Sequence, residues 1–478
     1  MLCQEPAIEG DIYSYKDGAS SYEFTLEAAW SQILSKLPEP SIRLLNMLSL
    51  VDPDKIPGQL FSPTVSTELT FPFTQFEYLS ARAPFLKYDI IIIVEDGILS
   101  IHRSVQSTRL RMINHKDRDE AFKAILPILR NHFPRQTLGD HMHAFWSSCE
   151  VFLASVLTFD SAVKEWQPLL KDSSSFLNLM CDCTWYLWEI GQYDEALRRL
   201  SSLETICSRT TGLNSLEAAR IYVNQGSVYS SLNRYGEAGP LFQKALDIRK
   251  TLLSEDHQLV VNSYMQVGNY YTWLERFDDA TNAHKHVVRM REKSNLVTPG
   301  IAITSYFNLA RACLMGMKLA ETKEAVTRAE IWIGKFINRL YIVGNINLAD
   351  GKVAEALKVH QMAYQKRKDS NAQPYLLATS QHKIGTIQAQ LGHLEQAIES
   401  ISEEITLLSS LPGRLACKLT RLSRAEMKLS DILLKGGLAS MSLVHKKKAI
   451  DYYKEAFNVA IIDQPELDFE KLVPPIDR

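Results

Sequence analysis

Two clusters of histidine and cysteine are the residues of this 478-residue chain whose types could bind a metal. His141 and His143 lie two positions apart with Cys149 nearby, and Cys181 and Cys183 form a second pair. Positions two apart on a helix point about 200° away from each other, so one ion cannot easily take both members of a pair from regular helix. We interpret the histidines as polar surface or loop residues and the cysteines as buried helix residues, and expect no metal site.

Acid–base and nucleophilic chemistry have little support. Asp256 precedes His257, an order that could suggest an acid–base pair, but its place in a loop between helical segments predicts a helix cap. No G-x-S-x-G, H-E-x-x-H, Rossmann fingerprint, C-x-x-C pair or G-x-x-x-x-G-K-[ST] loop occurs in the chain. We predict that the protein is not an enzyme and uses no cofactor.

Composition excludes several other classes of function. The formal net charge of −2 gives no whole-molecule attraction to nucleic acid or to acidic membranes. Seven scattered cysteines, an odd number, argue against a secreted disulfide framework. No window approaches 18 uninterrupted apolar residues, and the acidic N-terminus lacks the apolar core of a signal peptide. We expect a cytoplasmic protein with no nucleic-acid or membrane partner.

The elements that position any functional side chain are repeated helix pairs. Residues 213–292 hold two copies of one pattern, in which Ala238 matches Ala280 at a spacing of 42 positions and Gly226 matches Gly268. Small residues at these places allow the two helices of a pair to lie close together, because a larger side chain would push them apart. Two helical segments repeated in this way predict an α-solenoid.

The same register extends over residues 175–460 and predicts about seven helix pairs. Its small-residue position falls on these further residues: Ala196, Thr322, Ala356, Ala397 and, for the last pair, Ala449. The tail, residues 461–478, is rich in proline and acidic residues and is expected to be extended.

The front of the chain predicts a different module. Residues 1–22 lack periodicity and are expected to be disordered, whereas residues 23–115 alternate helical patterns with a hairpin signal, Asp96-Gly97 between two apolar runs. Pro84 is expected to end the helix before the hairpin, and a further helix follows from about Ser104. This order predicts a winged-helix-like domain, which linking helices over residues 116–174 join to the solenoid.

These residues resemble two known families. Gly226, Tyr229, Ala238, Phe242 and Ala245 follow the tetratricopeptide pattern, and the period resembles that of kinesin-light-chain-type repeats. The resemblance implies a mainly α fold: a right-handed solenoid of tetratricopeptide helix pairs, which binds protein or peptide in a concave groove.

The segment from Thr25 to Pro57, with Leu99–Gln106 after it, resembles the winged-helix segment of fungal NLR-like STAND proteins. In that family a histidine at the place of His102 contacts bound ADP, and the alternative for His102 is a structural bond between the hairpin and the next helix. Arg103 departs from the acidic residue of many members, and the chain contains no nucleotide-binding ATPase domain. The resemblance implies the sensor and control half of such a protein without its ATPase.

Polar side chains on the first helices are the candidate binding residues. Counting back from the small-residue position places a set of them toward the groove: Arg220, Asn224, Asn262, Gln266, Asn269, Thr304, Asn308, Arg311, Asn345 and Lys383. The five asparagines offer both a donor and an acceptor to an extended peptide backbone. The three cationic residues can hold acidic side chains or a carboxylate.

The sequence favours a non-enzymatic interaction scaffold or sensor that binds a protein or peptide. The resemblance to STAND proteins implies a role in signalling or recognition in a fungus. One alternative is the control half of a STAND-type switch that works with an ATPase domain from another chain or lost from the gene. A winged-helix DNA-binding regulator is disfavoured, because the expected recognition helix offers few cations, namely Arg109, Arg111 and Lys116. An accessory role in a biosynthetic or trafficking assembly stays open.

Overall fold

A computed structural model describes most of the chain and divides it into two compact units. The described residues are 26–61, 74–93, 97–137, 142, 145–167, 173–232, 234–293, 299–332, 337–369, 372, 374–411, 416–457 and 468–472. One unit comprises Met1–Tyr186 with Ser202–Gly212, and the other comprises Leu187–Ser201 with Leu213–Arg478. The disorder predicted for residues 1–22 lies outside the described residues.

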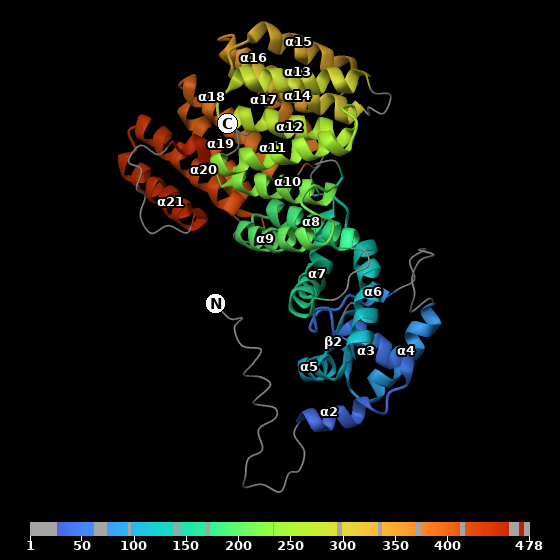
Figure 1. Cartoon of the computed structure of the whole chain (residues 1–478). Coiled ribbons are helices and arrows are strands. Elements are labelled where there is room, and N and C mark those ends of the chain that lie inside the picture. Colours follow the sequence, from blue (N-terminus) through green and yellow to red (C-terminus); the bar gives the residue numbers. More distant parts are fainter. Residues whose placement is uncertain are drawn as a thin grey trace. The chain divides into compact units, whose positions relative to one another are not determined.

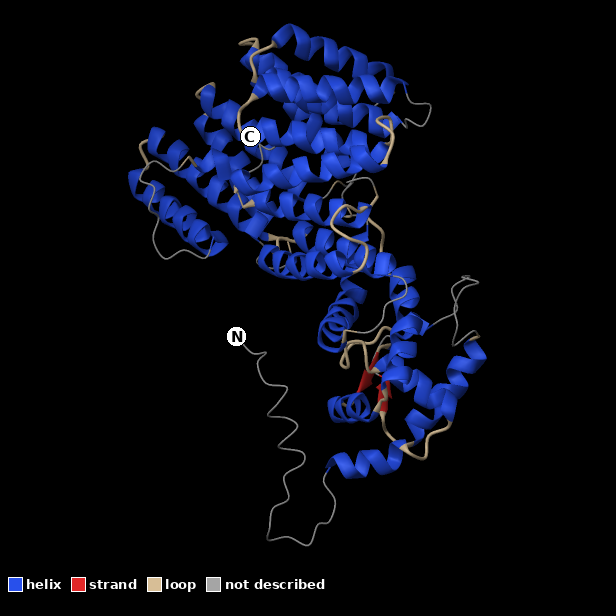
Figure 2. Ribbon diagram, viewed as in Figure 1, coloured by secondary structure: helices blue, strands red, loops and turns tan. Residues whose placement is uncertain are grey.

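The first unit combines helices with one hairpin, which is the red element of Figure 2. Its elements are α2 (Leu26–Leu34), α3 (Glu39–Leu48), η1 (Gly58–Phe61), α4 (Gln75–Lys87), β1 (Ile91–Ile93), β2 (Leu99–Ile101), α5 (Arg103–Met112), α6 (His115–His132), α7 (Trp146–Trp166) and most of α8 (Ser173–Glu189). Helix α3 packs against α4, α5 and α6. Its buried side chains Leu44, Leu45 and Leu48 fill the centre of this packing.

The predicted hairpin is present. Strands β1 and β2 are antiparallel, with Ile91 opposite Ile101 and Ile93 opposite Leu99. Gly97 has a φ of +73°, a left-handed conformation that glycine adopts without the steric cost of a Cβ. Asp96, the other residue of the turn signal, lies outside the described residues.

The expectation that Pro84 ends its helix is wrong. Helix α4 continues through Pro84 to Lys87. A proline removes only its own N–H from the helix, and so close to the C-terminus the remaining turn still closes through Tyr88 N–H to the carbonyl of Pro84. Tyr78, Ala81 and Phe85 are buried on one face, so tertiary packing holds the helix past the proline.

The second unit consists of successive helix pairs, coloured from green to red in Figure 1. The pairs are α10 (Leu216–Ser231) with α11 (Tyr235–Leu252), α12 (Gln258–Trp273) with α13 (Phe277–Lys293), α14 (Pro299–Met315) with α15 (Leu319–Trp332), α16 (Ile337–Ala349) with α17 (Val353–Asp369), α18 (Pro374–Gln390) with α19 (Leu394–Ser409), and α20 (Ala416–Lys435) with α21 (Ala439–Phe457). Helices α8 and α9 (Tyr193–Arg209) lie where the first pair was predicted. The prediction of about seven helix pairs is confirmed.

The recurring glycine is needed because a ring or branched side chain packs against it sixteen residues later. A Cβ on Gly226 would lie 2.8 Å from the Phe242 ring, and one on Gly268 would lie 2.8 Å from the His284 ring. The recurring alanines, among them Ala238 and Ala280, are fully buried. Small residues thus set the distance between the helices of each pair, as the sequence pattern predicted.

In the last pair, the small-residue position is not at Ala449, where the sequence pattern placed it. In six pairs, the residue five positions before the small-residue position has a positive φ: Gly191, Glu275, Met317, Gly351, Gly392 and Gly437. In the pair of α10 and α11 this residue lies outside the described residues. Gly437 places Ser442 at that position, two helical turns before the predicted Ala449. Ser442 is buried, and its side chain lies 2.9 Å from the Ser430 hydroxyl, which occupies the glycine position of the pair. The two serines bond across the interface at which the other pairs bring glycine and alanine together.

Candidate functional site

The described residues contain no metal-binding cluster. No group of three or more metal-capable side chains gathers among them, and His141 and His143 lie outside them. Cys181 and Cys183 are buried, as predicted, and Cys149 is buried as well; none of the three forms a disulfide. His257 caps α12: its Nδ1 accepts a hydrogen bond from the backbone N–H of Leu259 at 3.1 Å, which agrees with the predicted cap.

His102 caps α5 at the end of the hairpin. Its Nδ1 accepts a hydrogen bond from the backbone N–H of Ser104 at 3.3 Å and lies 2.6 Å from the Ser104 hydroxyl. That hydroxyl also accepts a hydrogen bond from the indole N–H of Trp30 at 2.8 Å. These contacts match the structural alternative for His102, a bond between the hairpin and the following helix.

Two of the predicted binding asparagines accept hydrogen bonds from arginines within the repeats. Arg291 donates to the buried Asn262 at 2.7 Å, and Arg311 donates to Asn269 at 2.9 Å. The first bond lies within the pair of α12 and α13, and the second links α12 to α14 of the next pair.

The other predicted binding residues differ in exposure. Thr304 is exposed, and Arg220, Gln266 and Asn345 are partly exposed, whereas Asn224 and Asn308 are buried. The Oδ1 atom of Asn345 is buried without a hydrogen-bond partner among the described residues. These side chains are spread over helices α10 to α16.

Lys383 belongs to a group of charged and polar residues that we name the C-terminal polar cluster. Its members are His382, Lys383, Glu404, Arg424, Lys428 and Glu470. Burial, together with the positive charges of Arg424 and Lys428, lowers the pKa of Lys383 to about 8 against the opposing effect of Glu470. A cation in this setting gains from every carboxylate brought near it.

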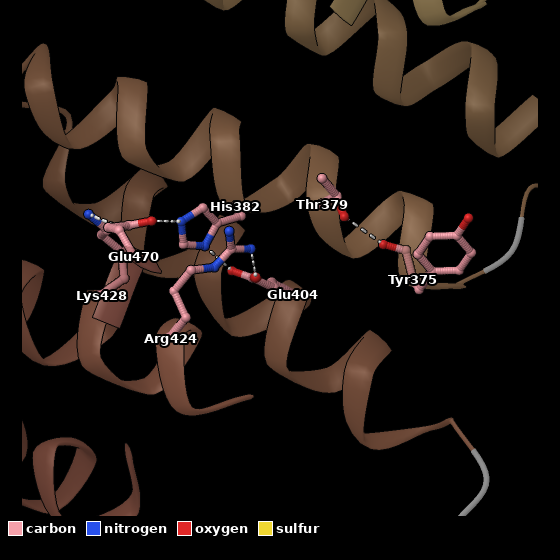
Figure 3. Close-up of polar contacts among 7 residues, drawn as sticks. All are labelled: Tyr375, Thr379, His382, Glu404, Arg424, Lys428 and Glu470. Atoms are coloured by element: carbon pink, nitrogen blue, oxygen red, sulfur yellow. Dashed lines mark hydrogen bonds and ion pairs between the residues drawn. The ribbon is translucent and has the colours of Figure 1, made fainter. Parts of the chain in front are cut away.

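The centre of the cluster is a buried carboxylate with two partners (Figure 3). Glu404 on α19 lies 2.8 Å from His382 Nδ1 on α18 and accepts a hydrogen bond from Arg424 Nη2 on α20 at 3.3 Å. Glu404 and Arg424 are each only 1% exposed, so their charges must be paired within the protein. The contacts join three successive helices.

The outer side of the cluster holds a second carboxylate, which comes from the tail. Glu470 Oε1 lies 2.7 Å from Lys428 Nζ, and its other oxygen lies 3.5 Å from His382 Nε2 (Figure 3). Burial alone would raise the pKa of Glu470, but the contacts with His382 and Lys428 outweigh it and hold the pKa well below its usual range. The site therefore favours an ionised carboxylate at this point.

Residues on either side of Glu470 are anchored as well. The segment Phe469–Leu472 forms η4, a turn of 3₁₀-helix packed on α20, where the sequence suggested an extended tail. The Phe469 ring meets Tyr453 edge to face at 6.3 Å, and Leu472 is 8% exposed. Glu470 N–H donates to Asp468 Oδ1 at 3.0 Å, which fixes the start of the turn. Sequence analysis identified Lys383 but missed the rest of this cluster.

The chemistry of the cluster is recognition of an anion. Without Glu470, three cations (Lys383, Arg424 and Lys428) would face the single carboxylate of Glu404. A carboxylate from another segment balances this excess and accepts hydrogen bonds from Lys428 and His382. The cluster contains no arrangement of nucleophile, base and oxyanion donors among the described residues.

Comparisons with known proteins agree with the repeat pattern. A family model described as tetratricopeptide repeat matches residues 183–251 and 217–293, and a domain of unknown function (DUF7779) matches residues 32–118. The Clustered mitochondria protein homolog of Candida albicans is 30% identical over 134 residues, which is 27% of this chain and 10% of that protein. Protein KINESIN LIGHT CHAIN-RELATED 3 of Arabidopsis thaliana is 24% identical over 235 residues, 47% of this chain and 35% of that protein.

Among solved structures, a STAND protein of Pyrococcus horikoshii with a tetratricopeptide repeat sensor is 13% identical, with a TM-score of 0.39 over 91% of this chain and 66% of that one. The chain spans about a tenth and about a third of the two curated relatives. Within the described residues, no helix is long and apolar enough to cross a membrane. The matched model and the observed helix pairs show that the chain contains tetratricopeptide repeats.

Proposed function

We propose that this protein is a non-enzymatic interaction scaffold or sensor whose C-terminal polar cluster binds an acidic segment of a protein partner. The observation that carries the proposal is Glu470, a carboxylate from a separate stretch of chain that contacts Lys428 at 2.7 Å and His382 at 3.5 Å. A site that accepts one carboxylate in this geometry can accept another of the same chemistry.

The predicted binding residues on the earlier pairs extend this surface toward the N-terminus. Thr304 is exposed and Gln266 is partly exposed, so a longer bound segment can reach both side chains. In this proposal the cluster supplies the charged anchor, and the polar side chains of α10 to α16 add hydrogen bonds along the partner.

A charge reversal in the cluster tests the proposal. The full chain captures partners from a fungal extract in three forms: unchanged, Lys428→Glu, and Lys435→Glu as a matched control. Lys435 lies on the same helix, is exposed, and is outside the cluster. A partner retained by the unchanged chain and by Lys435→Glu, but lost with Lys428→Glu, supports the site. An identical set of partners for all three forms contradicts it.

A further inference from the structure

The segment Asp468–Leu472 has three features of a bound ligand. Its aromatic residue meets Tyr453, its carboxylate pairs with Lys428, and its aliphatic residue is buried. Asp468 accepts the backbone N–H of Glu470, so the segment also stabilises its own turn. The segment thus presents aromatic, acidic and aliphatic side chains at positions 1, 2 and 4 of its turn.

We infer that this segment is an internal ligand that covers the C-terminal polar cluster, and that the partner is an acidic protein segment with the same order: aromatic, carboxylate, any residue, aliphatic. The inference rests on the proposed function and names its ligand chemistry. The partner must displace the tail before it reaches Lys428 and His382. Only a partner that binds the cluster more tightly than the tail does can therefore occupy it.

The individual contacts of segment 468–472 are weak enough for a partner to displace it. The Glu470 side chain is 36% exposed and Lys428 is 22% exposed, so water screens their ion pair and weakens it. Tethered segments nevertheless stay bound with weak contacts, because a short linker holds them at an effective concentration on the order of millimolar. Segment 468–472 begins eleven positions after Phe457, the end of α21.

The charge balance explains why another carboxylate must take the place of Glu470 when the tail leaves the cluster. Departure of Glu470 leaves Lys428, Lys383 and Arg424 with one buried carboxylate, Glu404. Proximity of like charges in a partly buried site is unfavourable, and an incoming carboxylate relieves it. A neutral or basic segment with the same apolar residues lacks this gain, so the cluster selects acidic partners.

The chain's own sequence provides the probe. A fluorescent peptide of residues 465–473, PELDFEKLV, is titrated into the full chain, and its anisotropy gives the affinity. The chain is used unchanged, as a tail-release variant with Glu470→Gln and Leu472→Ser, and as that variant with Lys428→Met added. A peptide with glutamine at the Glu470 position, PELDFQKLV, is the matched control ligand, and circular dichroism confirms that each variant is folded.

We expect the tail-release variant to bind the peptide at least about tenfold more tightly than the unchanged chain, because the internal competitor is weakened. Adding Lys428→Met should abolish that gain, and the glutamine peptide should bind more weakly to the tail-release variant. Equal affinity of the unchanged chain and the tail-release variant would overturn the covering role while leaving the proposed function intact. Absence of peptide binding to all forms would overturn the inferred ligand, and loss of partner capture with Lys428→Glu would still support the proposed function.

Discussion

The imidazole of His284 packs directly against Gly268, so close that a Cβ on residue 268 would lie 2.8 Å from the ring. His284 is fully buried, and neither of its ring nitrogens has a hydrogen-bond partner among the described residues. In the preceding pair the same position over Gly226 is taken by Phe242. The fold accepts either ring, but only the imidazole carries polar atoms that burial leaves unpaired.

Replacing this histidine with the ring of the preceding pair should stabilise the protein. We expect His284→Phe to raise the free energy of unfolding by about 1 kcal/mol at pH 7.5, because it removes a buried polar group without a partner. Urea unfolding followed by circular dichroism measures the change. His393→Gln, a substitution at an exposed histidine of α19, should leave stability unchanged.

The advantage of His284→Phe should grow in acid. Burial, aided by the charges of Arg311 and Arg291, lowers the pKa of His284 to about 3 from an unfolded value of 6.5. As pH falls below 6.5 the unfolded chain takes up a proton that the folded chain does not, so the unchanged protein loses stability down to about pH 3. The phenylalanine variant lacks this loss, which amounts to about 2 kcal/mol at pH 5. A gap between the two proteins that narrows from pH 7.5 to pH 5 would contradict this assignment.

Two glycines of one helix pair should respond to alanine in opposite ways. A Cβ on Gly226 would lie 2.8 Å from the buried Phe242 ring, whereas one on Gly236 would meet nothing within 4 Å. We expect Gly226→Ala to destabilise by about 2 kcal/mol through overpacking, and Gly236→Ala to stabilise by up to about 1 kcal/mol through helix propensity. Thermal unfolding of both variants in parallel tests this prediction. Equal shifts of the unfolding temperature would show that close packing does not explain the glycine at position 226.

Repeated buried arginines are a feature that sequence analysis did not detect. Arg249 donates to the Ser263 hydroxyl at 2.8 Å, and Arg367 donates to the Ser380 hydroxyl at 2.7 Å, each linking one pair to the first helix of the next. A double-mutant cycle with Arg249→Leu and Ser263→Ala should give a coupling of about 1 to 2 kcal/mol. Additive single effects would mean that Arg249 contributes by its packing alone.

The helix pairs were predictable because their spacing depends on contacts between residues close in sequence. Small residues at Gly226 and Ala238 define a pair within about a dozen positions, and the same register located every pair but the last. The last pair was misplaced on Ala449 because alanine was taken as the marker. The glycine at position 437, five before Ser442, would have placed it correctly through its turn conformation.

The C-terminal polar cluster was largely beyond sequence reasoning. Glu470 reaches Lys428 and His382 across 42 and 88 positions, and no local period reports such contacts. Lys383 was identified because it lies on a first helix in the repeat register. Its neighbours Glu404 and Arg424 are buried charges, which pattern analysis expects on the surface, and only the folded structure shows that they pair.

The left-handed turn between the helices of a pair gives a last prediction, at Met317, where methionine takes the place of glycine. Met317 has a φ of +56° and is 80% exposed, whereas Gly351 occupies the same position in the next pair with a φ of +74°. A side chain in this conformation costs about 1 to 2 kcal/mol, and the exposed methionine has little packing to lose. Glycine also costs about 0.5 to 1 kcal/mol through the entropy of the unfolded chain. We therefore expect Met317→Gly to stabilise by about 0.5 to 1 kcal/mol and Gly351→Ala to destabilise by about 1 kcal/mol, both measured by urea unfolding. A loss of stability in Met317→Gly would show that the methionine side chain makes a contact that outweighs its backbone strain.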